Sequence, residues 1–418
     1  MPRGLASWHF REMYITHLSL TNFRNFARLD LDIPRGPILL LGENAQGKTS
    51  LLEAIYFLAT FTSFHASHDR QLINFLIAND PLAVARIVMD FVRHEKSHRL
   101  EVRIIQETNG FSGSPRLRKE VLLDGVKYKI ADVIGRFNAV LFLPQLLSVI
   151  EGAPEERRRY INLALAQTLP RYASALMEYS RALSQRNALL KQINDYGGGM
   201  DQLAFWDEQL ARSGGILIYY RIQAIHELER IAARVHHELT RGGEVLRIAY
   251  QPAYDPLPQP PGQYALPLDS PISRAGLTLE QIQHGFKEGL EVLHGEEVAR
   301  GVTTIGPHRD EIRFLENGVD LGTYGSRGQV RTAMLALKLA EAAWMKEKTG
   351  SSPVLLLDEV LAELDTFRRA DLLDRLEINE QTLLTTTDLD LFDPNFVEEA
   401  TLWRIKSGRL EEEPGRLD

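Results

Sequence analysis

The pattern of apolar and polar positions near the N-terminus predicts strands followed by a helix. Over residues 14–33, the segments HLSL and LDLDI alternate apolar and polar positions, which indicates two half-buried strands joined by TNFRNF. A continuous apolar run at 38–41 predicts a buried strand, and residues 48–61 have helical spacing. Strand-like patterns return over 82–130, where an Asp-Gly pair at 124–125 predicts a hairpin.

The middle of the chain has a helical pattern. Apolar residues recur at three- and four-residue spacing over 154–194, DYGGGMD interrupts them, and a second such span covers 202–239. These spans predict an antiparallel pair of helices, either a plain packing unit or a projecting arm. Residues 251–276 are rich in proline and predict an extended loop, with a ligand for proline-recognition domains as the alternative.

The C-terminal third returns to alternating strands and helices. EIRFLENGVDL predicts a hairpin with an Asn-Gly turn, followed by a helix over 328–348, a strand over 354–357 and further alternation to residue 388. We therefore predict an α/β fold with an inserted, mainly α-helical lobe. The expected division is an N-terminal extension (1–12), a first part of the α/β lobe (13–152), the helical lobe (153–295) and a second part of the α/β lobe (296–418).

Composition narrows the class of protein. The 418 residues include no cysteine, which excludes a disulfide scaffold, a thiolate metal site and a cysteine nucleophile. No apolar run approaches the ~20 residues that span a bilayer, and we find no secretory signal, so we expect a cytoplasmic protein without a membrane partner. With a net charge of −8, any DNA would have to meet a local basic surface. Three clusters are candidates, although each also fits a solvated face: HEKSHR at 94–99, PRLRK at 115–119 and ERRR at 156–159.

The segment GENAQGKT matches the phosphate-loop pattern G-x-x-x-x-G-K-[ST] between a predicted strand and a predicted helix. Backbone N–H groups of such a loop surround phosphates, its lysine reaches the β- and γ-phosphates, and its threonine hydroxyl can bind Mg²⁺. A structural loop with a chance match is the alternative. The predicted nucleotide-binding residues are Gly42, Glu43, Asn44, Ala45, Gln46, Gly47, Lys48 and Thr49.

A second motif follows the apolar run VLLL. Asp358 and Glu359 come at its carboxyl end, where ligands lie in parallel α/β sheets. We expect Asp358 to hold Mg²⁺ through its water shell and Glu359 to orient or deprotonate the attacking water. A strand ending in a solvated acidic turn is the alternative. Asp365, in AELD, is expected at a subunit boundary.

The segment GSRGQ precedes a strongly helical sequence, so Ser326 is predicted near a helix N-cap. The free N–H groups there can bind a second anion, and Ser326, Arg327, Gly328 and Gln329 are candidates for this role. Because Lys48 already lies at a different helix N-terminus, the nucleotide would be held from two faces. An ordinary capped helix is the alternative.

Together these motifs resemble the RecF family of SMC-like, ABC-type DNA-repair ATPases. SRGQ resembles the ABC signature and AELD its D-loop, while HLSLTNFRNF before the phosphate loop, GAPEERRRY and TTIGPHRDEI resemble RecF elements. The resemblance extends from about residue 13 to the C-terminus. It implies an ATPase head of ABC/SMC type with a mixed sheet.

The resemblance implies a slow, Mg²⁺-dependent ATPase that forms an ATP-dependent homodimer. Ser326 of one subunit would face the nucleotide held by Lys48 of the other. The dimer would bind double-stranded DNA and junctions of single- and double-stranded DNA through the backbone, without sequence readout, and would assist RecA loading with RecO and RecR. The implied functions are DNA repair, recombination and replication.

The resemblance also assigns roles to residues outside the main motifs. Arg24 and Asn25 should lie near the nucleotide, and Gln145 is the candidate for sensing Mg²⁺ and the attacking water. Thr386 or Asp388 takes the place of the ABC switch histidine. His308, Arg309 and Asp310 are either a structural turn or a contact to nucleotide or DNA.

Two other functions remain open from the sequence. The chain could be an ABC-type ATPase subunit of another repair or transport complex, against which the long helical insertion and TNFRNF argue. It could also be a structural protein in which ATP only stabilises the fold.

Overall fold

The computed structural model describes residues 12–108, 115–257, 274, 276–376, 379–406 and 408–411. The chain divides into two compact units, the first made of residues 1–144 with 341–418 and the second of 145–340. The sequence placed these borders at 152/153 and 295/296. Residues 296–340 group with the helical unit because β10 (Glu311–Glu316) pairs antiparallel with β9 (Leu246–Gln251).

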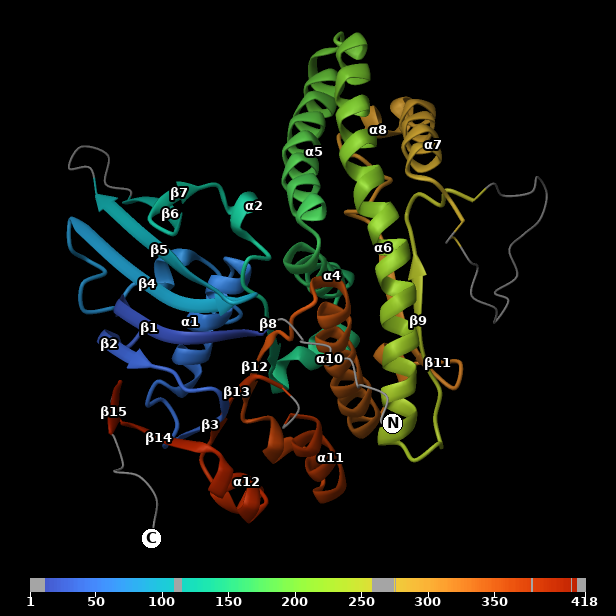
Figure 1. The fold of residues 1–418 in the computed structure, drawn as a ribbon. Helices are drawn as coiled ribbons and strands as arrows, with labels where there is room; N and C mark the ends of the chain where they lie inside the picture. The colour runs from blue at the N-terminus through green and yellow to red at the C-terminus, as the bar shows by residue number, and fades with distance from the viewer. Residues whose placement is uncertain are drawn as a thin grey trace, which may run out of the picture. The chain divides into compact units, whose positions relative to one another are not determined.

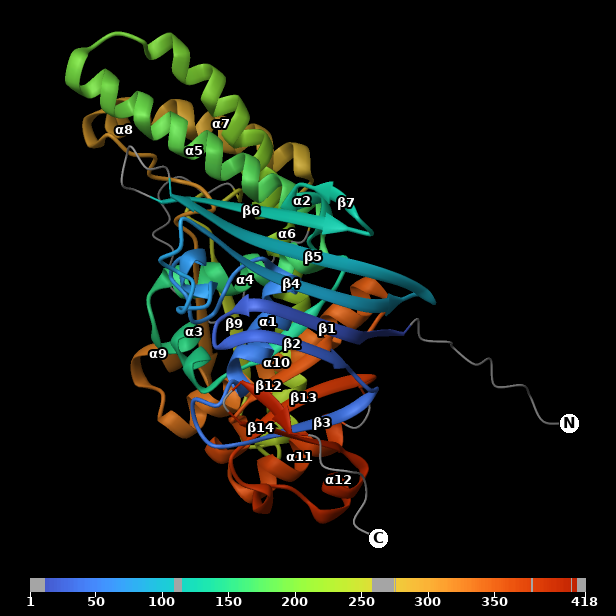
Figure 2. The ribbon, with the colours of Figure 1, turned by 90° about the vertical axis from the view of Figure 1, so that its left-hand side faces the viewer.

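The first unit contains a six-stranded antiparallel sheet. Its strand order is β2-β1-β4-β5-β6-β7, and Figure 2 shows its first five strands lying one beside the next. The strands are β1 (Met13–Phe23), β2 (Phe26–Asp32), β4 (Leu82–Arg93), β5 (Lys96–Thr108), β6 (Pro115–Leu123) and β7 (Val126–Tyr128). The hairpin joining β1 and β2 is tighter than predicted, since Phe23 pairs with Phe26 and leaves a two-residue turn.

A second sheet of the same unit is mainly parallel. Its order is β15-β14-β3-β13-β12-β8, and only β15 is antiparallel to its neighbour. The strands are β3 (Gly36–Leu41), β8 (Ala139–Phe142), β12 (Val354–Asp358), β13 (Gln381–Thr386), β14 (Thr401–Lys406) and β15 (Arg409–Glu411). Strands β12 and β13 are buried along their whole length, as is expected for central parallel strands.

Helix α1 (Lys48–Thr60) connects the two sheets. It contacts β8, β12 and β13 of the parallel sheet and β4 and β5 of the antiparallel sheet. Almost all its side chains are buried, because it is covered by a sheet on more than one side. The remaining short elements of this unit are η1 (Asp69–Leu72), α2 (Ile130–Val133), η4 (Val360–Glu363), α11 (Thr366–Leu376), η5 (Leu389–Leu391) and α12 (Pro394–Glu399).

The second unit is mainly helical. The pair α5 (Pro170–Tyr196) and α6 (Leu203–Leu239) packs as a long hairpin, which confirms the predicted glycine-linked pair (Figure 1). Its other elements are η2 (Pro144–Leu147), α3 (Ser148–Glu151), α4 (Pro154–Thr168), η3 (Met200–Gln202), α7 (Leu279–Val292), α8 (His294–Arg300), β11 (Val319–Asp320), α9 (Leu321–Tyr324) and α10 (Arg327–Thr349), whose last residues belong to the first unit.

The single helical span predicted over 154–194 is wrong in one respect. It is divided into α4 and α5 at Leu169, whose backbone is extended with φ −125° and ψ 96°. The residue before a proline avoids the helical region, and Pro170 then starts the next helix at a position that needs no N–H donor.

Two predicted segments lie largely outside the described residues: the N-terminal extension up to residue 11 and the proline-rich loop over 258–273 and 275. The predicted hairpins at 124–125 and 317–318 are both present, joining β6 to β7 and β10 to β11. Within the described part of the chain, no helix combines the length and apolar character that crossing a bilayer requires.

Candidate nucleotide-binding site

The loop from Gly42 to Gly47 leaves β3 and enters α1, and two glycines are required by its geometry. A Cβ on Gly42 would lie 2.5 Å from the carbonyl oxygen of Ile405. Gly47 has φ 116°, and a Cβ there would lie 2.8 Å from Asn25 Nδ2. The backbone contact at Gly42 leaves no room for a side chain, and at Gly47 the positive φ disfavours any residue with a Cβ.

The amine of Lys48 lies inside this loop. Its side chain is only 4% exposed, and Nζ donates hydrogen bonds to the carbonyl oxygens of Gly42 at 2.5 Å and Glu43 at 3.0 Å. Glu359 Oε1 lies 3.4 Å from the same amine. The loop thus holds a positive charge at the N-terminus of α1, where the helix dipole also favours an anion.

The Asp358 carboxylate connects the start of α1 with strands β12 and β13. It ends β12 and pairs in register with Thr385 of β13, the strand that lies between β12 and β3. The Thr49 hydroxyl donates to its two oxygens at 3.0 and 2.9 Å, and the Thr385 hydroxyl donates at 2.7 Å. The strand order therefore brings residues 49 and 358 together across 309 positions of sequence.

Glu359 is held by its backbone rather than by its side chain. It has φ 53°, which is uncommon for a residue with a Cβ, and its N–H donates to Thr385 Oγ1 at 3.0 Å. Its side chain is 41% exposed and lines the pocket. A carboxylate in this position can accept a proton from a water molecule that enters the pocket.

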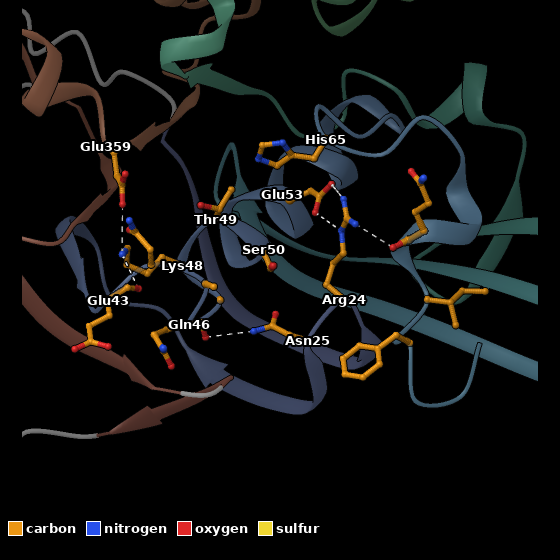
Figure 3. A pocket seen from close by; sticks show the side chains of 16 residues that line it. Arg24, Asn25, Glu43, Gln46, Lys48, Thr49, Ser50, Glu53, His65 and Glu359 are labelled. Atoms are coloured by element: carbon orange, nitrogen blue, oxygen red, sulfur yellow. Dashed lines mark hydrogen bonds and ion pairs between the residues drawn. The ribbon is translucent and has the colours of Figure 1, made fainter. Parts of the chain in front are cut away.

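A pocket of about 530 Å³ is lined by Lys48, Thr49 and Glu359, and all its lining residues belong to the first unit (Figure 3). Arg24 and Asn25, from the β1–β2 turn, are part of its wall. Arg24 donates to both oxygens of Glu53 at 2.7 Å, and Asn25 Nδ2 donates to the Gln46 carbonyl at 3.2 Å. The β1–β2 turn therefore supports the phosphate loop directly.

The oxygen and nitrogen atoms at this site suit a nucleotide bound together with Mg²⁺. Mg²⁺ binds oxygen ligands, and the Thr49 hydroxyl and the Asp358 carboxylate already lie within 3.0 Å of each other. Phosphate groups would meet the Lys48 amine and the N–H groups at the start of α1. The arrangement can therefore bind a nucleotide and place a carboxylate, Glu359, beside its phosphates.

The signature segment belongs to the second unit. Ser326 and Gln329 form a reciprocal cap of α10: the Ser326 N–H donates to Gln329 Oε1 at 2.9 Å, and the Gln329 N–H donates to Ser326 Oγ at 3.3 Å. The predicted position of Ser326 near a helix N-cap is therefore present. Arg327 and Gly328 form the first turn of this helix. Gln145 also lies in the second unit, exposed in η2.

Asp365 and Asp388 both cap short helices. Asp365 accepts from the Arg368 N–H at 2.9 Å and pairs with the Arg368 guanidinium, and these contacts lower the pKa of its carboxyl group. Asp388 accepts from the Asp390 N–H at 2.9 Å, while its own N–H donates to Thr386 Oγ1 at 3.1 Å. Neither carboxylate is among the side chains lining the pocket. Their roles in the reaction stay predictions.

For His308 and Asp310 the structure favours the structural alternative. Asp310 is 1% exposed and accepts from Arg221 Nη1 at 2.6 Å, Tyr250 Oη at 2.5 Å and the Ala253 N–H at 3.0 Å. Burial raises the pKa of Tyr250 well above its usual range and lowers the pKa of His308 to about 4. Arg309, by contrast, is exposed.

Each basic cluster contains side chains that pair with acidic ones. In the first cluster, His98 lies 3.0 Å from Asp124 and Arg99 lies 3.4 Å from Asp90. Arg118 and Lys119 pair with Glu120 and Asp69, and Arg157 pairs with Glu311. These pairs reduce the positive charge available to DNA at the predicted positions.

Sequence reasoning missed several members of the pocket wall. These are Ser50, Glu53, His65, Gln71, Ile73 and Phe75. Thr385, which orders Asp358 and Glu359, was visible in LLTTTD only as a neighbour of the expected switch position. Phe75 is 72% exposed at the pocket and has no signal in the sequence, because the segment between α1 and β4 reaches the phosphate loop only in the folded chain.

The fold and the site define a P-loop nucleotide-binding head of ABC/SMC type. The family model "RecF/RecN/SMC N terminal domain" matches residues 14–400. The "DNA replication and repair protein RecF" of Roseiflexus castenholzii is 41% identical over 410 residues, which cover 95% of this chain and 99% of the relative. The protein of the same name from Chloroflexus aurantiacus is 39% identical, with the same shares covered.

A solved structure described as "recombination mediator protein RecF-ATPrS in RecFOR pathway" has a TM-score of 0.79 at 29% identity and covers 96% of this chain and 99% of its own. A corresponding structure of RecF with ATP has a TM-score of 0.77 at 28% identity, over the same shares. This chain therefore belongs to the RecF family, and the predicted family and fold class are confirmed.

Proposed function

We propose that this chain binds ATP with Mg²⁺ in the pocket of the first unit and acts as an ATP-dependent protein of DNA replication and repair. The observation that carries the proposal is the convergence of Lys48, Thr49, Asp358 and Glu359 at the carboxyl edge of the parallel sheet. Relatives of the same family are named for replication and repair, and solved relatives contain ATP or an ATP analogue.

Each of these residues has a distinct role in nucleotide binding. The Lys48 amine would exchange the Gly42 and Glu43 carbonyls for phosphate oxygens, and Thr49 with Asp358 would hold Mg²⁺. When bound, Mg²⁺ neutralises part of the phosphate charge. The Thr385 hydroxyl keeps the Asp358 carboxylate oriented in the absence of nucleotide.

Hydrolysis would depend on Glu359. Its carboxylate lines the pocket beside Lys48 and is exposed enough to meet water. We expect it to orient the attacking water and accept its proton, which makes the protein an ATPase. We further propose that turnover is slow, because no histidine occupies the position where Thr386 and Asp388 lie, and that Gln145 and Asp388 contribute only once a second subunit completes the site.

The ATP-bound chain would then dimerise. Ser326 caps α10 in the second unit, so the N-terminus of this helix can receive the γ-phosphate of a nucleotide held by another copy. Asp365 would lie at the same boundary. The dimer would bind double-stranded DNA and single/double-strand junctions through backbone contacts and assist RecA loading with RecO and RecR, and it would do so in the cytoplasm.

Two variants test the nucleotide mechanism. Lys48→Ala should abolish ATP binding and phosphate release, and Glu359→Gln should retain binding while accumulating an ATP-bound dimer, measured by light scattering with DNA present. A Glu359→Gln protein that remains monomeric with ATP and DNA would refute the dimer mechanism. Multiple-turnover phosphate release that survives in Lys48→Ala would show that the pocket is not the site of hydrolysis.

DNA binding with and without ATP, over a series of salt concentrations, tests the link between the two ligands. Backbone contacts predict that the logarithm of the affinity falls linearly with the logarithm of salt concentration. Equal DNA affinity with and without ATP would show that the nucleotide does not control DNA binding. A subunit of another complex is the alternative function; co-purification with a membrane protein would favour it.

A further inference from the structure

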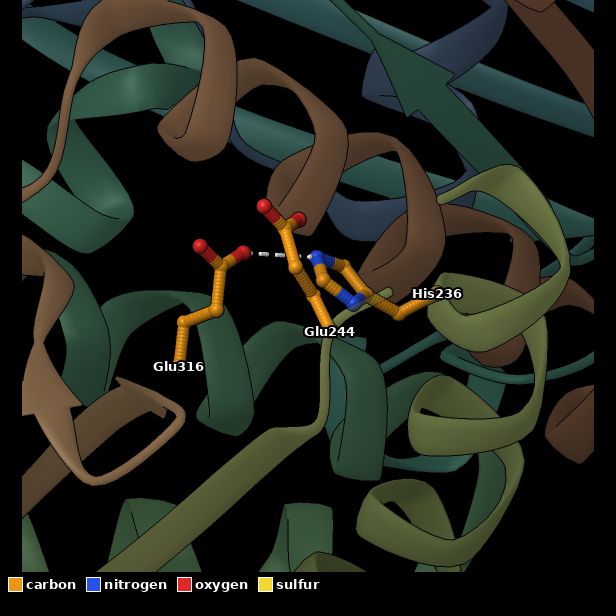
Figure 4. A group of neighbouring side chains, drawn as sticks. All are labelled: His236, Glu244 and Glu316. Carbon is orange, nitrogen blue, oxygen red and sulfur yellow. Dashed lines mark ion pairs between the residues drawn. The ribbon is translucent and has the colours of Figure 1, made fainter. Parts of the chain in front are cut away.

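A cluster of ligand-type side chains lies in the second unit and is used by none of the roles above. His236 comes from the last turn of α6, Glu244 from the loop before β9, and Glu316 from the end of β10. One potential ligand atom from each side chain lies within 4.8 Å of the other two. Figure 4 shows the three side chains converging from these separate segments.

We infer that His236, Glu244 and Glu316 form a binding site for one divalent transition-metal ion, of which Zn²⁺ fits best. One imidazole and two carboxylates are ligands that Zn²⁺ takes, and neutral histidine with two carboxylates carries the charge that a divalent ion balances. Three protein ligands leave a fourth position for water or another ligand.

The distance and burial of the His236–Glu316 pair suit a shared metal ion. The Glu316 side chain is 1% exposed, and its Oε2 lies 3.0 Å from His236 Nε2 yet accepts no hydrogen bond. Adjacent ligand atoms of a tetrahedral zinc site lie roughly 3.3 Å apart, which is close to this spacing. A buried carboxylate oxygen without a hydrogen bond is costly, and a bound cation removes that cost.

The backbone around the cluster is fixed in advance. Glu316 lies opposite Leu246 in the β9–β10 pair, so the segment carrying Glu244 must pass beside it. The Asn317 side chain accepts from the Val245 N–H at 3.0 Å, and the Asn317 N–H donates to the Val245 carbonyl at 3.0 Å. The strand pairing and these hydrogen bonds hold the segments that carry Glu244 and Glu316 in place before any metal binds.

The other oxygen of Glu316 links the cluster to the signature helix. Gln329 Nε2 donates to Glu316 Oε1 at 2.5 Å, and the same Gln329 closes the N-terminal cap of α10 with Ser326. A hydrogen bond to a ligating carboxylate is the usual outer support of a metal ligand. The half-buried Glu244 gives the ion a route from solvent. Metal occupancy would therefore stabilise the start of α10.

The test is metal uptake by the full-length protein. The protein is stripped with a chelator, dialysed against micromolar Zn²⁺ without nucleotide, and its bound zinc is counted by mass spectrometry; Co²⁺ substitution then reports the ligand field by visible absorption. We expect about one Zn²⁺ per chain, undisturbed by millimolar Mg²⁺, and a shift of the Co²⁺ spectrum from that of the aqueous ion.

Three variants separate the site from the fold. Glu244→Gln changes a half-buried loop residue, and His236→Ala removes the imidazole; each should weaken zinc binding at least tenfold. His237→Ala removes the exposed histidine beside the site and should bind zinc like the unaltered chain. The inference is overturned if the unaltered chain takes up no zinc, or if Glu244→Gln and His237→Ala bind it equally. In either case His236 and Glu316 form an ion pair without metal.

Discussion

Arg24 provides the sharpest test of how the pocket is built, because it pairs with a buried carboxylate and also lines the pocket. Its guanidinium donates from Nε and Nη2 to the two oxygens of Glu53 at 2.7 Å, and from Nη1 to the Gln71 carbonyl at 3.0 Å. Glu53 is 2% exposed and also accepts from the Ser63 hydroxyl. The Arg24→Ala change would leave this carboxylate buried without its cation.

The expected cost follows from this burial. Removing one partner of a buried pair destabilises by about 3–5 kcal/mol. Arg24 itself is 23% exposed, so water can replace part of the lost guanidinium, and we expect the lower end, about 3 kcal/mol. For a unit of this size, that corresponds to a fall of roughly 6–12 °C in the melting temperature of the first unit.

Calorimetry of four proteins measures this cost: the unaltered chain, Arg24→Ala, Glu53→Gln, and the double variant. The double variant removes the buried charge while the introduced glutamine can still accept from Ser63, so it should recover a large part of the lost stability. Arg28→Ala is the matched control, since Arg28 is exposed on β2, and it should change stability by less than about 0.5 kcal/mol.

ATP titration of the same proteins separates stability from nucleotide contact. If Arg24 contacts the nucleotide, the double variant regains stability but keeps an ATP affinity reduced at least tenfold. Recovery of ATP affinity in the double variant would show that Arg24 only positions the loop. Equal melting temperatures for Arg24→Ala and Arg28→Ala would refute the buried ion pair as a source of stability.

Three further changes test separate parts of the molecule. Gly47→Ala should weaken ATP binding, measured by titration calorimetry, because a residue with a Cβ is strained at φ 116° and its Cβ would displace the Asn25 side chain that supports the loop. Thr385→Val should cost about 2 kcal/mol in thermal unfolding and slow phosphate release, because two hydrogen bonds that order the acidic pair are lost. Burial lowers the pKa of His308 to about 4, so between pH ~6.5 and 4 the unfolded chain binds a proton that the folded chain does not. The unfolding free energy should therefore fall by at most ~1.4 kcal/mol for each unit by which the pH is lowered through this range. In His308→Gln this contribution should be absent from denaturant unfolding curves.

The sequence predicted the parts of the site that lie within one strand–loop–helix segment. The phosphate loop, its helix and the acidic pair after an apolar run all have local signals, because each depends on periodicity and on residues at fixed offsets. The hairpin turns at 124–125 and 317–318 were predictable for the same reason. The residues involved are close in sequence, so their chemistry can be read without the fold.

What the sequence could not predict depends on strand order. Strand β13 follows β12 in the chain but lies between β12 and β3 in the sheet, and this places Thr385 beside Asp358. Gln381, 1% exposed, bonds to the backbone of Ile15 on the other sheet at 2.8 and 3.0 Å. No periodicity marks a polar residue that connects two sheets. The grouping of β10 with the helical unit also depends on its pairing with β9, which is far away in sequence.

Glu359 shows how these non-local contacts determine the chemistry. A left-handed backbone at a residue with a side chain costs about 1–3 kcal/mol, and the conformation persists only where neighbouring contacts enforce it. Here the enforcing contact is the hydrogen bond from the Glu359 N–H to Thr385 Oγ1, and the same hydroxyl donates to Asp358. One threonine therefore orders both the carboxylate assigned to Mg²⁺ and the carboxylate assigned to water. The acidic pair is consecutive in sequence, but the hydroxyl that contacts both of its residues comes from a third residue on the neighbouring strand.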